Sequence, residues 1–492
     1  MSAAFFMEQV GKLLTLACLF LLPWQTRYIF WAPWVGTTES EFGVISLYVT
    51  MLLAGCAAGS WWIGSVLKEG EKRRQTTDGR RQKTDGRYPI SLICSLLSVV
   101  CFLITLPSPT HAWILNIFFS LLLGYATYKT AHQNGRAILY AMCAGLIPVV
   151  GLGMWQMSVG WSPASSWLGL ASRSAEHLGD SVLVIEGKRI LRMYGSFPHP
   201  NIFGTVIALI FGVMASLSFQ PPFAEGFGVG EIFKNPEQES RRFLTAFGMT
   251  QTSQLVIIPM LIVAVLFCIS RSAALAMACA FITYLGFSYK NIFQRRTLFS
   301  IALFLPVLIW TLQFISPSLI ALRGQSFTEQ QSISERVAQV GEWWQVMEQN
   351  GVWGTGIYQY PQVLADIQGV SLPAWVYQPV HNVFLLVIAE LGLFWCGVVG
   401  VGLLIVIKTK DSRQQTADKR YITSVVCRLP SAVLSPQSLP LLITIYSLSW
   451  FDHALWTSWS GMSYTATAIA LVFAGGQSRI STLSQGVLDE KK

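Results

Sequence analysis

His381 is the residue of this chain best placed for proton transfer. It lies at residues 379–382, where a long polar segment meets the apolar stretch 383–407. A histidine at the mouth of an apolar helix can titrate near neutral pH while it faces water. If the other unusual polar residues share its face of a membrane, the chain is a membrane enzyme that acts on a charged substrate. If they do not, His381 is an ordinary interfacial residue.

Two arginines stand where a positive charge is costly. Arg271 interrupts an apolar hairpin with almost no loop around it, so it needs an acidic partner or an anionic ligand. Arg336 follows a capping-box pattern at 332–335, and a cation in the first helical turn is unfavourable. The apolar residues after it recur at helical spacing: Val337, Val340, Trp344 and Met347. We expect an amphipathic helix here, in which Arg336 has a role other than helix stability.

Polar residues at three further positions have structural interpretations that compete with functional ones. Residues 192–201 run from Arg192 to His199, between two prolines, at the start of another apolar segment, and His199 could be simply interfacial. Asp452 could orient a histidine, pair with an arginine or stabilise a turn. The glycine-rich run 351–358 could expose backbone amides or end the preceding helix.

The composition indicates which elements carry these residues. Hydrophobic residues make up 52% of the chain and charged residues 12%, and apolar runs of near 20 residues recur throughout, which excludes an ordinary soluble domain. We predict an all-α, polytopic transmembrane protein of about twelve spans with a helical outer-face loop. The predicted spans are 11–33, 43–67, 89–107, 111–128, 137–159, 197–219, 254–270, 272–289, 297–315, 382–407, 438–452 and 455–475.

The basic residues predict the orientation. Lysine and arginine gather in 68–88 and in alternate later loops, which favours a cytoplasmic location for those loops and for both termini. The polar set then faces the other side, on segments that include the large outer loop 316–381. We divide the chain into amino-terminal helices (1–190), a catalytic membrane region (191–475) and a cytoplasmic tail (476–492). The charge indicates membrane orientation, not nucleic-acid binding, and the nine cysteines form no disulfide or metal motif.

The order of these motifs over about residues 190–460 resembles the O-antigen ligase family of polytopic glycosyltransferases. The matching segments are Arg-Met-Tyr-Gly-Ser-Phe-Pro-His-Pro-Asn at 192–201, Ser-Arg-Ser-Ala at 270–273, Glu-Arg with Trp343 at 335–343, Gly-Thr-Gly-Ile-Tyr at 354–358, His-Asn-Val-Phe-Leu at 381–385 with Glu390-Leu391-Gly392, and Asp-His-Ala-Leu-Trp at 452–456. The cytoplasmic loop 220–253 departs from the family and has no assigned role.

The resemblance implies transfer of a glycan from an undecaprenyl-pyrophosphate carrier to an acceptor hydroxyl, at the outer face of the cytoplasmic (inner) membrane and among its lipids. His381 then matches the family's catalytic histidine, which could act as a general base. Arg271 and Arg336 match the arginines that hold the pyrophosphate in the family, and Arg192 matches a third basic position for substrate binding. The residues that match supporting positions are His199, Asn201, Asn382 and Asp452. No cofactor or metal is implied, and no Asp-x-Asp pair occurs in the chain.

Several alternatives remain open at this point. The acceptor hydroxyl could belong to a lipid A core sugar (ligase), to a second lipid-linked repeat (polymerase) or to a protein serine or threonine (O-oligosaccharyltransferase). A polysaccharide transporter or flippase is a different class of protein. It is disfavoured because the predicted spans carry almost no charge apart from Glu390, and because no internal repeat is evident.

Overall fold

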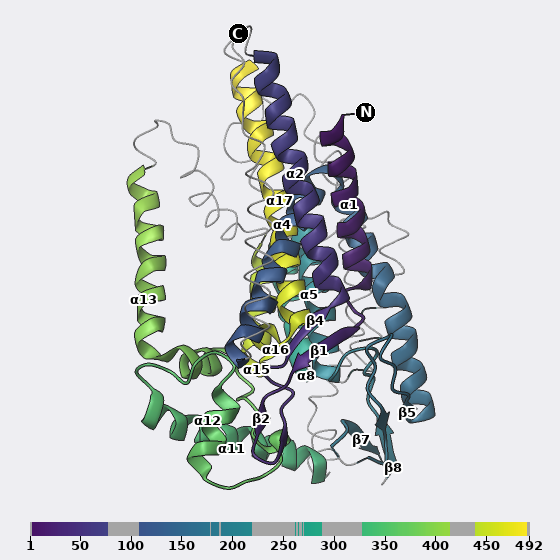
Figure 1. Ribbon diagram of the computed structural model, residues 1–492, viewed down its shortest axis with the longest axis vertical. Coiled ribbons are helices and arrows are strands. Elements are labelled where there is room, and N and C mark those ends of the chain that lie inside the picture. The colour runs from purple at the N-terminus through teal and green to yellow at the C-terminus, as the bar shows by residue number, and fades with distance from the viewer. Residues whose placement is uncertain are drawn as a thin grey trace.

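The described part of the chain is mainly a bundle of long helices with a smaller layer of helices and strands at one end (Figure 1). The computed structural model describes residues 2–76, 108–177, 179–185, 188–218, 261, 264, 268, 270–287, 327–413 and 438–489. The bundle helices are α1 (Ala3–Leu21), α2 (Val49–Thr76), α4 (Pro109–Val159), α5 (Pro200–Ser218), α8 (Arg271–Phe287), α15 (Leu439–Phe451) and α17 (Trp459–Asp489). The end layer contains α11 (Phe327–Asn350), α12 (Tyr360–Gln368) and a short 3-10 helix, η4 (Ala374–Val376). Helix α13 (Val383–Arg413) rises from this layer, and α16 (Ala454–Thr457) joins α15 to α17.

Five described helices are long and apolar enough to cross a membrane: α1, α2, α4, α5 and α13. Helices α8 and α15 are apolar but shorter. The multi-pass helical character expected from the sequence is therefore present. Two predicted spans, 89–107 and 297–315, lie outside the described residues, as does most of 254–270.

Helix α4 joins two predicted spans, 111–128 and 137–159. Its 51 residues would extend about 75 Å as one straight helix, far more than a bilayer core requires. Asn134 interrupts the helix with φ −158° and ψ 77°, and its side-chain oxygen accepts a hydrogen bond from the Ala137 N–H at 3.1 Å. This side-chain bond caps the second half of α4.

Four small antiparallel sheets within the described residues correct the all-α expectation. Strand β1 (Arg27–Trp31) pairs with β4 (Ile45–Tyr48), and β2 (Trp34–Val35) pairs with β3 (Thr38–Glu39). Strand β5 (Trp161–Ser162) pairs with β6 (Arg173–Ser174), and β7 (Val182–Ile185) pairs with β8 (Lys188–Leu191). The predicted span 11–33 is also wrong at its carboxyl end, because α1 ends at Leu21. The aromatic and β-branched residues of β1 favour a strand as strongly as a membrane helix.

The amphipathic helix predicted after residue 332 is present as α11, but it begins earlier, at Phe327. The predicted capping box is therefore wrong, and Arg336 lies beyond the first turn. Trp343 of α11 donates a hydrogen bond from Nε1 to the Leu385 carbonyl of α13 at 2.8 Å. Val337, Val340 and Trp344 are exposed.

Helix α13 breaks at Gly392, where the backbone adopts φ 78° and ψ 161°. The loop after α11 binds to the broken turn. The Thr355 N–H donates to the Ala389 carbonyl at 2.9 Å, and the Leu393 N–H donates to the Gly351 carbonyl at 2.9 Å. A Cβ on Gly392 would clash with the Gly354 nitrogen, so this contact requires glycine. The glycine-rich run thus serves to fix α13 against the end layer.

Buried Glu390 adds side-chain contacts to the same joint. Its Oε1 accepts a hydrogen bond from the Tyr358 N–H at 2.9 Å, and its Oε2 accepts one from Trp456 Nε1 at 2.7 Å. These two bonds connect α13, the loop before α12 and α16. The two bonds therefore fix the position of α13 relative to α16, and with it the positions of the turns that precede these helices.

Candidate active site

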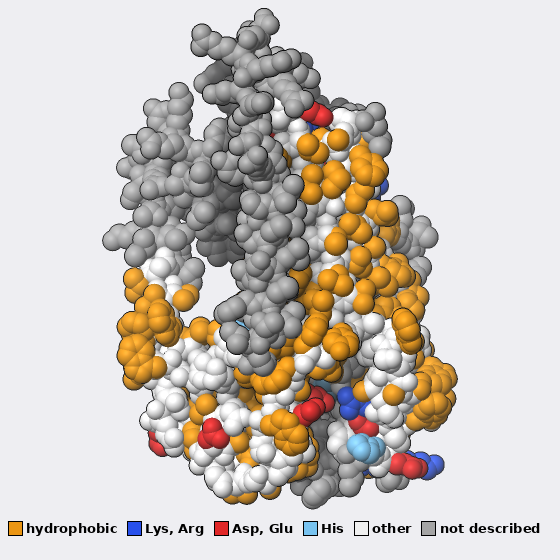
Figure 2. Space-filling view, in the orientation of Figure 1, with side chains coloured by type: hydrophobic (Ala, Val, Ile, Leu, Met, Phe, Trp, Pro, Cys, Tyr) orange, Lys and Arg blue, Asp and Glu red, His pale blue; other side chains and the backbone are white. Residues whose placement is uncertain are grey.

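Charged side chains gather at the strand-bearing end of the molecule, whereas hydrophobic side chains cover the visible helices above it (Figure 2). His381 lies in the turn before α13 and is half-buried. Its backbone N–H donates to Oε1 of Gln339 on α11 at 3.4 Å. Among the described residues, its buried Nδ1 has no hydrogen-bond partner. A buried polar atom of this kind calls for an explanation, and a substrate group is one.

A second histidine stacks on His381. The ring centroids of His381 and His453 are 5.0 Å apart, with an interplanar angle of 24°. His453 is buried, and its Nδ1 lies 2.7 Å from Oγ1 of Thr457. The ring of Phe42 makes an edge contact with the His453 imidazole, and the two ring centroids are 5.5 Å apart. His453 therefore has contacts that fix both its position and its ring plane, and it supports His381 in turn.

Asp452 precedes His453 and ends α15. The carboxylate is buried, and its Oδ1 accepts a hydrogen bond from the Ala454 N–H at 2.9 Å. Burial raises the pKa of Asp452, while the neighbouring His381 and Arg336 oppose that rise. Helix α13 packs against both α11 and α15, which connects the end of α15 with the helix that carries Arg336.

The lowered pKa of His381 favours its neutral form at physiological pH. Burial is the largest cause that lowers its pKa, to about 3, and the neighbouring His453 and Arg336 lower it further, while Asp452 opposes them. Burial likewise lowers the pKa of His453 to about 4. A neutral imidazole has one nitrogen that can accept a proton, which is the form a general base needs.

Asn382 fixes the start of α13. Its side-chain oxygen accepts from the Leu385 N–H at 3.0 Å, as an amino-terminal cap does, and its Nδ2 donates to the Trp450 carbonyl of α15 at 3.2 Å. The residue next to His381 thus ties α13 to α15.

Arg271 and Arg336 line one cavity of about 540 Å³. Arg271 is the first residue of α8, and Arg336 projects from α11. The other lining residues are mostly apolar: Ser272, Leu275, Val337, Val340 and Phe451. Apolar walls make the field of the two guanidinium groups stronger than it would be in open water. Two positive groups among apolar side chains are the surroundings that suit an anion with an apolar chain.

Arg192 has a different environment. It follows β8, and its guanidinium donates twice to the Cys268 carbonyl, at 3.0 and 2.7 Å. It also donates to Oγ of Ser181 at 2.8 Å and to Oδ1 of Asn201 at 3.0 Å. These four bonds connect the β7–β8 hairpin to α5 and to the residues before α8. Arg192 and Asn201 therefore meet, but not in the cavity of Arg271 and Arg336.

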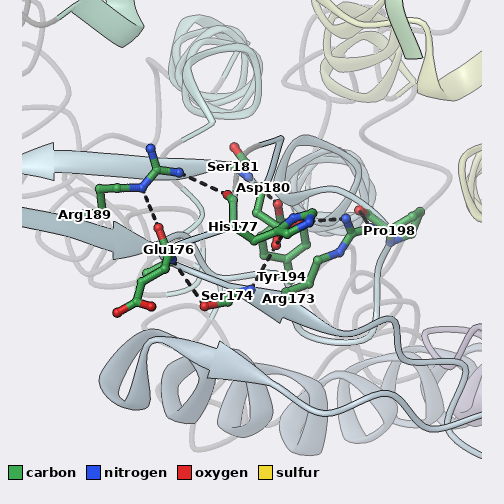
Figure 3. A network of polar contacts seen from close by, with 10 residues as sticks. Arg173, Ser174, Glu176, His177, Asp180, Ser181, Arg189, Tyr194 and Pro198 are labelled. Atoms are coloured by element: carbon green, nitrogen blue, oxygen red, sulfur yellow. Dashed lines mark hydrogen bonds and ion pairs between the residues drawn. The ribbon is translucent and has the colours of Figure 1, made fainter. Parts of the chain in front are cut away.

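Neighbouring arginines form a polar network around the hairpins (Figure 3). Arg173 forms an ion pair with buried Asp180 at 2.9 Å and donates to the Pro198 carbonyl at 3.1 Å. Arg189 donates to the carbonyls of Ala175 and His177, at 2.5 and 3.1 Å. This network fixes the loop that leads to His199.

His199 lies at the start of α5, where its Nδ1 accepts from the Asn201 N–H at 3.1 Å. Its side chain is exposed to solvent. The bond to Asn201 places His199 beside the residue whose Oδ1 accepts from Arg192.

The contacts of His453 and Phe42 with the site were not predicted from the sequence. His453 follows Asp452 directly, so the Asp-His pair was a usable signal. Phe42 is distant in sequence, and only tertiary packing brings it to the site. Within the described residues, no group of three or more His, Cys, Asp or Glu side chains is arranged to hold a metal ion.

Residues 255–407 match the family model described as O-Antigen ligase. The match includes Arg271, Arg336 and His381, and it ends before Asp452. No curated protein and no solved structure matches the chain.

Proposed function

We propose that this chain, which belongs to an O-antigen ligase family, transfers a glycan from an undecaprenyl-pyrophosphate carrier to a hydroxyl acceptor. Family membership supports a membrane glycosyltransferase of ligase or polymerase type, with a lipid-linked glycan donor and a glycan acceptor. The observation that carries the finer proposal is the cavity shared by Arg271 and Arg336, beside neutral His381.

The arginine cavity suits the leaving group of this reaction. Pyrophosphate gains charge as the bond from the anomeric carbon to its oxygen breaks, so positive groups already in place lower the barrier. Arginine provides a permanent charge and forked donors that match phosphate oxygens. Leu275, Val337 and Phe451 give the same cavity apolar walls, which suit the isoprenoid chain next to the phosphates.

His381 is the proposed general base. Its imidazole accepts the proton of the acceptor hydroxyl while the acceptor oxygen forms a bond to the anomeric carbon. The bond from that carbon to the pyrophosphate oxygen breaks, and undecaprenyl pyrophosphate leaves with the bonding electron pair. Direct attack from the opposite face inverts the configuration at the anomeric carbon. The stacked His453 keeps the ring of His381 in place.

The location of the site and its metal requirement follow from the same proposal. Basic loops predict that the strand-bearing end faces outward from the cytoplasmic membrane and that both termini lie inside.

We assign stabilisation of the pyrophosphate to the two arginines and not to a metal ion. EDTA should then leave the transfer rate unchanged, whereas a loss restored by Mg²⁺ would contradict this part of the proposal.

The test uses His381→Ala and His381→Gln in purified full-length protein with a lipid-linked glycan donor. Because general-base catalysis contributes about 10²–10⁴-fold, both variants should lose at least about a hundredfold in transfer rate. His177→Ala is a matched control, because the side chain of His177 is mostly exposed and lies in the hairpin network. Full activity of the His381 variants, at the same protein concentration as the unaltered protein, would rule out His381 as the base.

A further inference from the structure

The connection between β5 and β6 carries no ionisable acid or base. Residues 137–172, which run from the second half of α4 to the residue before β6, contain no Asp, Glu, Lys, Arg or His. Helix α4 ends at Val159, so the last part of this stretch is a loop and not a membrane helix. The next twenty residues, 173–192, contain eight ionisable residues and form the charged β7–β8 hairpin region. The two neighbouring hairpins therefore suit different surroundings.

The uncharged loop folds into a tight turn with an apolar tip. Ser165 and Leu170 exchange two backbone hydrogen bonds, of 2.9 and 2.8 Å, and Trp167 and Leu168 lie between them. The side chain of Trp167 is 87% exposed. The Leu168 N–H donates to Oγ of Ser165 at 3.3 Å, and the Trp167 carbonyl accepts from Oγ1 of Thr26 at 2.7 Å. A turn whose backbone groups are bonded in this way can leave water at low cost.

Strand β1 presents further aromatic side chains beside this turn. Gly169 packs so closely on Gln25 that a Cβ there would clash with the Gln25 backbone. Strand β4 is mostly buried, whereas its partner β1 exposes Tyr28, Ile29 and Phe30. The rings of Tyr28 and Phe30 are in contact, with centroids 4.9 Å apart. Hydrophobic side chains also gather, in Figure 2, at the side of the strand-bearing end where Figure 1 labels β5.

The second half of α4 connects this surface to the lipid-facing side of the bundle. Its exposed positions recur at helical spacing and form one stripe: 147, 148, 151, 154, 155, 158 and 159. Helix α4 is long and apolar enough to cross a membrane, so an uncharged exposed stripe on it faces lipid. At the end of the stripe, the ring of Trp155 contacts that of Trp161 in β5, with centroids 5.4 Å apart. The lipid-facing stripe thus continues into the loop.

We propose that loop 161–172 and strand β1 form an interfacial anchor, which rests in the lipid headgroup region at the strand-bearing end. Tryptophan and tyrosine favour that depth, because each ring joins an apolar body to a polar group. The anchor does not enter the hydrocarbon, since among the described residues β1 pairs with β4 alone and its outer edge needs water. Continuity with the α4 stripe favours the bilayer over a second copy of the chain as the partner.

The anchor is joined directly to the charged hairpin network. Arg173 follows the loop, forms an ion pair with buried Asp180 and donates to the Pro198 carbonyl. An anchor that rests at the membrane surface therefore sets the height of the β7–β8 hairpin and of the segment that leads to α5. The anchor does not depend on the reaction proposed above.

Lipid photolabelling tests the anchor in the full-length protein. The protein is reconstituted into vesicles of phosphatidylethanolamine and phosphatidylglycerol that contain a phospholipid with a diazirine near the headgroup end of one acyl chain. After irradiation, chymotryptic peptides are examined for lipid adducts by mass spectrometry. Peptides from 147–159 of α4 show that labelling works, and peptides from 173–192 are the water-facing control.

We expect adducts in 161–168 and in 27–31, as in α4, and none in the control hairpin. Trp167→Glu should abolish the adducts in 161–168, because a carboxylate is unfavourable among lipids. The exposure of Trp167 makes this change compatible with the fold. Lys188→Glu, a matched change in the other hairpin, should leave all adducts as in the unaltered protein.

Adducts confined to α4 would overturn the anchor, because the turn and β1 would then lie in water. Equal labelling of both hairpins would contradict the difference between them, and adducts in 161–168 that persist in Trp167→Glu would contradict the role of the tip. An unlabelled tip, together with a dimer in detergent that Trp167→Glu dissociates, would assign this surface to a second copy of the chain instead.

Discussion

Five described arginines at this end of the molecule fall into two groups that differ in their surroundings. Arg173, Arg189 and Arg192 donate to carbonyl, carboxylate, hydroxyl and amide oxygens of the protein around the β7–β8 hairpin. Arg271 and Arg336 instead line a cavity of about 540 Å³ with mostly apolar walls. The first group holds chain segments together, and we assign substrate binding to the second.

This difference shows why residue type and position in the sequence are insufficient to assign a role. Arg192 and Arg271 are both arginines beside apolar segments, and the family resemblance implies substrate binding for both. The structure shows that the guanidinium group of Arg192 donates hydrogen bonds to Cys268, Ser181 and Asn201. We therefore propose that Arg192 positions the loop before α5 and that Arg271 contacts the substrate.

The largest difference between the groups is expected in the transfer rate. Arg271→Ala and Arg336→Ala should each lower it by about 10²–10³-fold, as loss of one group that stabilises developing negative charge does. Arg189→Ala, in the other group, should change it by less than about threefold. Transfer is measured with purified protein and lipid-linked donor, at matched concentrations of folded protein. Equal losses in all three variants would remove the distinction.

Arg192→Ala should act mainly on stability. It removes four hydrogen bonds, and a bond from a charged donor contributes about 1.5–3 kcal/mol. We expect a lower Tm in detergent, with most of the transfer rate per folded molecule retained. Arg192→Lys should recover part of the Tm. A loss of rate as large as that of Arg271→Ala, at unchanged Tm, would move Arg192 into the substrate-binding group.

The smallest expected effect is a displaced pH profile. His381 has a pKa of about 3 in the folded protein, below its ordinary value, so it stays neutral and active as the pH falls through 6. Between the folded and ordinary pKa values the unfolded chain binds more protons, so stability also falls as the pH decreases in that window. His453→Asn removes one cause of the lowered pKa.

In His453→Asn the acidic limb of the transfer rate should therefore move to higher pH, toward the ordinary histidine value. The measurement is kcat/KM for the donor from pH 4 to pH 8. A purely structural role of His453 would lower the rate at every pH without moving the limb. An acidic limb already near pH 6.5 in the unaltered protein would contradict the burial of His381.

The sequence predicted the helical membrane character and an amphipathic α11, and it places His381, Arg336 and Asp452 on one face of the membrane, which stays a prediction. Each of these depends on local periodicity or on the side of the membrane to which loop charge assigns a segment. The motifs that flank membrane helices are brought together because helix ends meet at one end of the bundle.

The strands, the cavities and the contacts of Phe42 could not be predicted in the same way. Strand β1 consists of aromatic and β-branched residues that fit an apolar span equally well, and its partner β4 lies beyond another hairpin. The stacking of His453 on His381 depends on the turn after α15, whose geometry is set by Asp452 and Glu390 contacts. Such contacts between distant segments leave no periodic signal in the sequence.

The most direct test of the central claim is the inhibition constant of undecaprenyl pyrophosphate, the released carrier, measured in the unaltered protein and in three variants. Arg271→Ala and Arg336→Ala should each weaken inhibition by at least about tenfold, because a charged hydrogen bond to phosphate is lost. Arg189→Ala should leave it unchanged. Inhibition that is unaltered in Arg271→Ala and Arg336→Ala would contradict the claim that these two arginines bind the pyrophosphate.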